Sequence, residues 1–227
     1  MRVNRFVAAA SGLSRRAADL AVADGRVTVD GEAVGVGFDV ADGAAVRLDG
    51  ALLSLPERHR LVMLNKPVGY VCSRVRQGEA PTVYELLPAE FSGLRPVGRL
   101  DRDSSGLLLF SDDGDFIFKL THPSQDKNKV YRVKLARPLS ASDIEWLESG
   151  VELEDGPSVL KVETSVGRTV TVSLREGRNR QLRRTFGEID NGIIDLQRVS
   201  MGEFQLADLP VGRWRELEAP TAAEASR

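Results

Sequence analysis

The chain has 227 residues, of which 42% are hydrophobic and 28% are charged, and its formal net charge is −2. Those values are typical of a globular protein with one medium domain and an appendage, and they give no global argument for a polyanionic partner. The single cysteine excludes an internal disulfide or a multi-cysteine zinc site, and no apolar run reaches the roughly 18 residues of a membrane span. The apolar patch near the start is too short for a signal peptide, so we expect a cytoplasmic protein without membrane contact.

Residues 1–50 predict a small module of two helices and a hairpin. Apolar residues at helical spacing begin at Val3, and Ser14 is a predicted N-cap for a second helix. An Asp-Gly turn at 30–31 joins two strand-like pieces. Together these elements make a domain near the lower size limit for independent stability.

This module resembles the alpha-L RNA-binding module, the ribosomal S-four-like domain. The matching stretches are Arg2-Val3-Asn4-Arg5-Phe6, Gly12-Leu13-Ser14-Arg15-Arg16-Ala17 and Gly25-Arg26-Val27-Thr28-Val29-Asp30-Gly31. The resemblance implies that Arg15 and Arg16, at a helix N-terminus, contact an RNA backbone. A solvated basic face remains the alternative, because the module holds six arginines against seven acidic residues.

Residues 51–60 read as a linker, and a larger domain follows over 61–218. Its predicted strands are 61–64, 106–111, 130–135, 159–164 and 169–174, and its predicted helices are 82–87, 116–121, 140–149 and 178–189. Strands and helices without strict alternation favour an α+β fold with a mixed, largely antiparallel sheet. Residues 219–227 are expected to form a disordered tail.

An acidic stretch surrounds a buried strand in this domain. Asp101 and Asp103 directly precede the apolar run 107–110, and they begin a spacing that matches a calcium loop. That interpretation fails because position 12 is Asp112 rather than a bidentate Glu and because positions 7 to 10 are apolar. A glycosidase carboxylate pair is conceivable, but adjacent acids in a turn are usually solvated. We therefore expect no metal site, and we expect the acids at 112, 113 and 115 to form a solvated turn.

A basic stretch covers residues 169–189. From Arg175 to Arg184 there are five arginines and one acid, a local net charge of +4 on an acidic chain. On the predicted helix Arg180 and Arg184 point to solvent, and Arg183 lies on the border between core and surface. The pattern indicates a polyanion-binding segment, with a merely solvated basic helix as the alternative.

Ordered motifs across residues 1–218 resemble the pseudouridine synthases that modify ribosomal RNA (the RsuA/RluB-like family). They are Lys66-Pro67-Val68-Gly69-Tyr70, Gly98-Arg99-Leu100-Asp101-Arg102-Asp103-Ser104-Ser105-Gly106-Leu107-Leu108, His122-Pro123, Lys129-Val130-Tyr131-Arg132-Val133 and Glu176-Gly177-Arg178-Asn179-Arg180-Gln181-Leu182-Arg183-Arg184. Departures are small: Ser104-Ser105 replaces the usual threonines, and Thr185 stands where methionine is common.

The resemblance implies an isomerase that converts a specific uridine of ribosomal RNA to pseudouridine, with no cofactor. It implies that Asp101 is the catalytic carboxylate, that Arg183 is its ionic partner and that Tyr131 stacks on the target uracil. Arg99 is the candidate to fill the space left by the flipped base. The expected RNA contacts are Arg15, Arg16, Lys66, Arg178, Arg180 and Arg184.

Large-subunit ribosomal RNA is slightly favoured over small-subunit RNA, and the partner could be a pre-ribosomal particle. A monomer is expected. The rival class is a non-catalytic RNA-binding or ribosome-assembly factor that uses the same basic helix. A metal-dependent nuclease is a weaker third reading, and it would require divalent ions.

Overall fold

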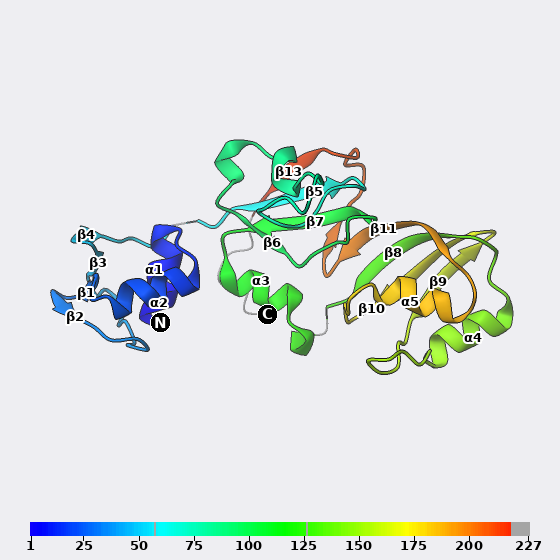
Figure 1. Ribbon diagram of the computed structural model, residues 1–227, viewed down its shortest axis with the longest axis horizontal. Helices are drawn as coiled ribbons and strands as arrows, with labels where there is room; N and C mark the ends of the chain where they lie inside the picture. Colours follow the sequence, from blue (N-terminus) through cyan, green and yellow to red (C-terminus); the bar gives the residue numbers. More distant parts are fainter. Residues whose placement is uncertain (57, 126, 219–227) are drawn as a thin grey trace. The chain divides into compact units, whose positions relative to one another are not determined.

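The structure, a computed structural model, describes residues 1–56, 58–125 and 127–218 (Figure 1). The tail predicted at 219–227 lies outside these residues. The chain divides into two compact units, the first made of residues 1–59 with 112–114 and the second of residues 60–111 with the chain from 115 onward.

The first unit contains two helices and a four-stranded sheet. Its elements are α1 (Val3–Ser11), α2 (Arg15–Ala23), β1 (Val27–Val29), β2 (Glu32–Ala33), β3 (Val46–Leu48) and β4 (Ala51–Leu52), with strand order β2-β1-β3-β4. Ser14 caps α2, because its hydroxyl accepts the backbone N–H of Ala17 at 3.1 Å. Asp30 and Gly31 both have positive φ and form the tight turn between β1 and β2. β4 lies in the stretch predicted as linker and pairs with β3, so the sheet extends beyond residue 50.

The second unit is built on a mixed nine-stranded sheet. Its strands are β5 (Leu61–Lys66), β6 (Arg95–Val97), β7 (Ser105–Ser111), β8 (Lys129–Leu135), β9 (Lys161–Val166), β10 (Thr169–Leu174), β11 (Ile193–Met201), β12 (Phe204–Gln205) and β13 (Trp214–Leu217). The main path runs β13-β5-β7-β11-β8-β10-β9, with β6 beside β7 and β12 beside β11. Only the β7–β11 pairing is parallel, which confirms the predicted mixed, largely antiparallel sheet.

Helices cover both faces of this sheet. They are η1 (Val83–Leu86), η2 (Ala89–Phe91), α3 (Gly114–Thr121), η3 (Pro123–Gln125), α4 (Ala141–Ser149) and α5 (Gln181–Glu188). Leu182 and Phe186 of α5 pack on the larger core together with β8 and β10. Phe116 and Leu120 of α3 pack on the opposite face with alternate residues of β5 and β7. β7 is therefore buried on both sides, which fixes the backbone that follows the Asp101 turn.

Three sequence predictions need correction here. The helix predicted at 178–189 begins only at Gln181, because Arg180 adopts a left-handed conformation with φ of 46° and acts as the N-cap. The helix predicted at 82–87 is a short 3-10 helix, closed by a capping box between Thr82 and Glu85. The acids at 112 and 113 are half-buried rather than fully solvated.

Candidate active site

A buried lysine, Lys66, stabilises the turn that carries Asp101. The side chain of Lys66 is fully buried, and its ammonium donates to the backbone carbonyls of Pro67, Asp101 and Ser104 at 3.1, 3.0 and 2.7 Å. Burial lowers the pKa of Lys66 to about 8, although the charges of Asp101 and Asp103 work in the other direction. Lys66 was predicted to bind RNA, but its burial removes it from the surface, and it orders the turn instead.

Four residues on neighbouring strands pair with one another in a row across the sheet, close to this turn. Lys66 on β5 lies opposite Gly106 on β7, Gly106 lies opposite Arg198 on β11, and Arg198 lies opposite Tyr131 on β8. Directly paired residues share a face of a sheet, so these side chains point the same way. Gly106 has φ of 104°, and a Cβ there would lie only 2.7 Å from the backbone nitrogen of Arg198. Glycine at 106 is therefore needed for β11 to approach β7.

Arg180, the N-cap of α5, and Arg183 within α5 make their shortest contacts to acidic residues with Asp103 rather than with Asp101. Arg180 donates to both carboxylate oxygens of Asp103 at 3.0 and 2.9 Å, and its Nη1 lies 4.0 Å from Oδ2 of Asp101. Arg183 donates to the backbone carbonyl of Asp103 at 2.7 Å, and its Nε lies 3.1 Å from Oδ2 of Asp103 without hydrogen-bond alignment. The predicted pairing of Arg183 with Asp101 is therefore wrong in this structure. The arginine closest to Asp101 is Arg180, which had been expected to face solvent.

Asp103 is the anionic centre of this cluster. Partial burial opposes its ionisation, but the hydrogen bonds from Arg180 and the charges of Arg183 and Arg180 outweigh burial and hold the pKa of Asp103 below its ordinary value. Asp103 therefore stays charged near neutral pH and draws the N-terminal end of α5 to the turn before β7.

Two further arginines of the basic stretch, Arg178 and Arg184, are bound to a second acid, Asp155. Arg184 forms a two-pronged ion pair with Asp155 at 2.9 and 2.8 Å. Arg178 donates to the same carboxylate at 2.7 Å and also to the carbonyls of residues 155, 156 and 157. Arg178 is thus a mainly buried support for the loop at 154–157, and Arg184 is partly neutralised.

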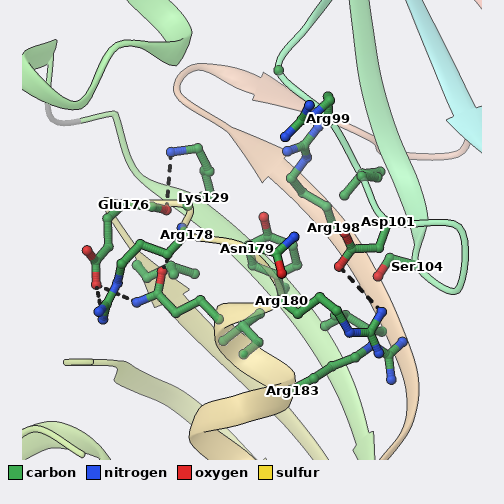
Figure 2. Close-up of a pocket in the computed structure, with 18 of the residues that line it drawn as sticks. Arg99, Asp101, Ser104, Lys129, Glu176, Arg178, Asn179, Arg180, Arg183 and Arg198 are labelled. Atoms are coloured by element: carbon green, nitrogen blue, oxygen red, sulfur yellow. Dashed lines mark hydrogen bonds and ion pairs between the residues drawn. The ribbon is translucent and has the colours of Figure 1, made fainter. Parts of the chain in front are cut away.

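A cavity of about 410 Å³ opens where these groups converge (Figure 2). Its lining is Gly98, Arg99, Leu100, Asp101, Ser104, Thr121, Lys129, Tyr131, Leu174, Arg175, Glu176, Gly177, Arg178, Asn179, Arg180, Gln181, Leu182, Arg183, Leu196, Arg198 and Met201. Cationic side chains outnumber acidic ones in this lining, and Asp101 is one of only two acids. The cavity therefore suits an anionic ligand that presents a reacting atom to Asp101.

The structure brings most of the predicted site residues together. Asp101, Arg99, Tyr131 and Arg183 line the cavity, with Arg99 exposed and Tyr131 only 9% exposed. Arg15 and Arg16 are exposed on α2 of the other unit.

Sequence reasoning missed three residues of this site, Asp103, Ser104 and Arg198. Asp103 and Ser104 belong to the motif quoted for the family resemblance, and their closeness to Asp101 in the sequence could have indicated that they lie at the site. Arg198 lies on a strand that was not predicted.

Across residues 1–56, 58–125 and 127–218, no group of three or more histidine, cysteine, aspartate or glutamate residues is placed to hold a metal ion. Within those same ranges, no helix has the length and apolar character needed to cross a membrane.

Comparison with known proteins gives a consistent picture. A family model described as RNA pseudouridylate synthase matches residues 60–188. Ribosomal large subunit pseudouridine synthase B of Yersinia pestis is 36% identical over 231 residues, which cover 96% of this chain and 72% of that protein. Ribosomal small subunit pseudouridine synthase A of Pseudomonas aeruginosa is 36% identical over 225 residues, which cover 96% of this chain and 97% of that protein.

A solved structure supports the same grouping. The crystal structure of a pseudouridylate synthase matches with a TM-score of 0.70 and 31% identity, and the match covers 100% of this chain and 98% of that one. The fold is thus that of an isomerase that acts on RNA uridine. The chain belongs to the RNA pseudouridylate synthase family.

Proposed function

We propose that the protein isomerises one specific uridine of ribosomal RNA to pseudouridine, with the large-subunit RNA favoured. The observation that carries this proposal is the position of Asp101, at the edge of a basic cavity that also contains a buried tyrosine. Several of the similar curated proteins are named for the large subunit, but a small-subunit synthase is equally identical at 36%. The preference for the large subunit therefore rests on the number of such relatives and not on their identity.

The cavity residues fit the steps of this reaction. The target base leaves its helix at a cost of a few kcal/mol, and Tyr131 provides an aromatic surface for it inside the cavity. The bond from uracil nitrogen 1 to the anomeric carbon breaks, the ring turns, and a bond from carbon 5 to the same sugar carbon forms. Carbon 5 loses its proton and nitrogen 1 gains one, so the product has the same atoms as the substrate. Asp101 supplies the carboxylate, either by adding to the sugar or by abstracting a ribose proton. No electron is gained or lost overall, so the isomerisation needs no redox partner.

The remaining predicted contacts belong to this proposal. Arg99 is exposed at the cavity and is the candidate to occupy the helix after the base leaves. Arg15 and Arg16 give the first unit two exposed charges for an RNA backbone, as the alpha-L resemblance implies. The proposed enzyme is a monomer, and its substrate is ribosomal RNA, either free or in a pre-ribosomal particle. Its proposed location is the cytoplasm.

Mapping pseudouridines in ribosomal RNA, in cells with and without the protein, tests the proposal. One uridine should be converted only when the protein is present, and purified protein should release tritium from carbon 5 of uridine in the same RNA. RNA binding without any pseudouridine would instead identify a non-catalytic assembly factor. Activity is expected to persist in excess EDTA, and a loss that magnesium reverses, on RNA of unchanged fold, would support a metal-dependent enzyme.

A further inference from the structure

Arg198 is a buried cation whose hydrogen-bonding capacity is largely unused within the protein. It is 2% exposed, and its Nε donates to the backbone carbonyl of Leu107 at 2.8 Å. Its Nη2 is buried and has no hydrogen-bond partner among the described residues, and no carboxylate of those residues lies within ion-pair distance. A buried guanidinium costs free energy unless acceptors surround it, so a structural role alone explains Arg198 poorly.

Lys66, the neighbouring buried cation, differs from Arg198 in its hydrogen bonding. Lys66 lies in the same row of the sheet, and all three of its donors are used by backbone carbonyls. Burial is the main cause of the low pKa of Lys66, and the positive charge of Arg198 adds to it. The fold therefore satisfies one of two neighbouring cations completely and leaves the other, a residue of the cavity lining, with an unpaired Nη2.

The surroundings of Arg198 indicate which part of a nucleotide would meet these donors. Arg198 lies opposite Tyr131 in the β11–β8 register, on the same face of the sheet, and both residues line the cavity. Figure 2 shows Arg198 on the same side of the cavity as Asp101 and Ser104. The hydroxyl of Ser104 is also buried without a partner among the described residues. Two unsatisfied polar groups thus belong to residues that line the same cavity as Tyr131.

A phosphate is a poorer match for this position. The phosphates of a flipped nucleotide remain with the RNA backbone at the mouth of the cavity, where Arg99 and Arg180 are exposed or half-exposed. The base enters deepest, and a uracil presents two carbonyl oxygens as acceptors.

We propose that Arg198 donates a hydrogen bond to a carbonyl oxygen of the flipped uracil and holds its ring over Tyr131 beside Asp101. This inference rests on the proposed isomerisation. When the bond from nitrogen 1 to the anomeric carbon breaks, its electron pair stays with the uracil, and the negative charge is shared with the carbonyl oxygens. A guanidinium at one of those oxygens stabilises that charge more than the neutral base, and so acts on the rate rather than only on binding.

The test uses a synthetic RNA stem-loop that contains the uridine mapped for the wild-type enzyme. The target position carries uridine, 2-thiouridine or 4-thiouridine, because sulfur is a weaker acceptor than oxygen. Single-turnover rates are measured by tritium release from carbon 5 for wild type, Arg198→Gln and Arg198→Lys. Arg132→Gln is the matched control, since Arg132 lies on β8 next to Tyr131 but is exposed and donates to Gln197.

In the wild-type enzyme one of the two thio substitutions should slow the reaction about 10- to 100-fold, the range for a hydrogen bond to a charged group. In Arg198→Gln the reaction with uridine should be slower by a similar factor, and the added effect of that thio substitution should shrink to about twofold. RNA affinity should stay within about threefold, and Arg132→Gln should behave like wild type. The position of the sensitive sulfur identifies the oxygen that Arg198 contacts.

Two results would overturn the assignment of Arg198 alone. The first is a wild-type enzyme that forms pseudouridine and is slowed by neither thio substitution, a result that needs no variant to fold. The second is a thio effect as large in the Arg198 variants as in wild type. No product from the wild-type enzyme on ribosomal RNA would overturn the proposed function, and the role of Arg198 with it.

Discussion

Nη2 of Arg183 donates to the backbone carbonyl of Asp103 at 2.7 Å, and Nε of Arg183 lies 3.1 Å from the carboxylate of Asp103. Arg183 is therefore bound to the turn that carries Asp101 and not to Asp101 itself. Arg180 is the cation 4.0 Å from Asp101. The two arginines should consequently influence the reaction in different ways.

Replacing each arginine by alanine should separate these effects. Arg180→Ala should lower the rate and weaken RNA binding, because Arg180 is an exposed cation of the cavity lining. Arg183→Ala should lower the rate about tenfold and leave RNA affinity within about threefold, because the turn loses a support while the removed charge is mainly buried. Single-turnover rates at saturating RNA and filter binding provide the measurements. Weaker RNA binding in Arg183→Ala with unchanged binding in Arg180→Ala would contradict this geometry.

Asp101→Asn should abolish isomerisation and leave RNA affinity within about threefold, since it removes the charge and keeps the shape. Tritium release reports the activity, and filter binding reports the affinity. Asp195→Asn, an exposed position on β11 outside the cavity, is the control and should retain full activity. Substantial turnover by Asp101→Asn would remove Asp101 from the mechanism.

Deprotonation of Lys66 should reduce the activity at alkaline pH. Above its pKa of about 8 the amine has only two N–H groups for three carbonyls, so the Asp101 turn loosens and the rate should fall. Global stability should change in the opposite sense. Because the fold lowers this pKa from 10.5, the unfolded state binds more protons between about pH 8 and 10.5, and the contribution of Lys66 to stability rises there.

The alkaline loss should disappear in Lys66→Met, which should be slower than wild type but should lack a limb near pH 8. Rates and denaturant midpoints measured on the same samples distinguish local loosening from unfolding. Parallel loss of activity and stability above pH 8 would assign the limb to unfolding.

Asp155 is expected to limit RNA binding by pairing with Arg184. The hydrogen bonds from Arg184 hold the pKa of Asp155 below its ordinary value, so the pair persists at neutral pH. Asp155→Asn should release Arg184, tighten RNA binding and steepen the dependence of log affinity on log salt by about one unit. Adding Arg184→Ala to this variant should restore the wild-type slope. A slope that Asp155→Asn leaves unchanged would show that Arg184 does not contact RNA.

Arg15 and Arg16 provide a test of the first unit. Their joint replacement by alanine should weaken binding to large RNA and reduce the salt slope by about two units, without a change in the rate at saturating RNA. Arg47→Ala, at an exposed position on β3 of the same unit, is the matched control. Equal salt slopes for wild type and the double variant would remove these arginines from the RNA contact.

The predicted fold was most accurate where local signals were strong. β10 was predicted with its exact bounds, and Ser14 was correctly identified as the cap of α2. The strand Ile193–Met201 was missed, because its polar residues interrupt the alternation that marks a half-buried strand. Its place between β7 and β8 depends on long-range pairing, which local patterns do not contain.

The candidate site, like the fold, was predicted well where local signals were strong and poorly where it depends on tertiary structure. The family resemblance implied Asp101 and Tyr131, local charge indicated the basic stretch, and the structure places them around one cavity. Helical periodicity misplaced Arg180, because a left-handed residue at the helix start changes the direction of its side chain. Arg183 contacts Asp103 and not Asp101 because of the backbone path of the turn, and this path cannot be predicted from sequence spacing.

The late position of β11 in the chain has a consequence for synthesis on the ribosome. β11 lies between β7 and β8 in the finished sheet, although both of these strands precede it in the sequence. Until residues 193–201 have emerged, the nascent chain holds two partial sheets, with an open edge along β8 and at the start of β7, and it lacks Arg198. Long-range pairing of this kind is slow, and open edges attract other chains. We therefore expect a newly made chain to remain inactive, and to be most exposed to aggregation, until residues 193–201 have been translated and have paired with β7 and β8.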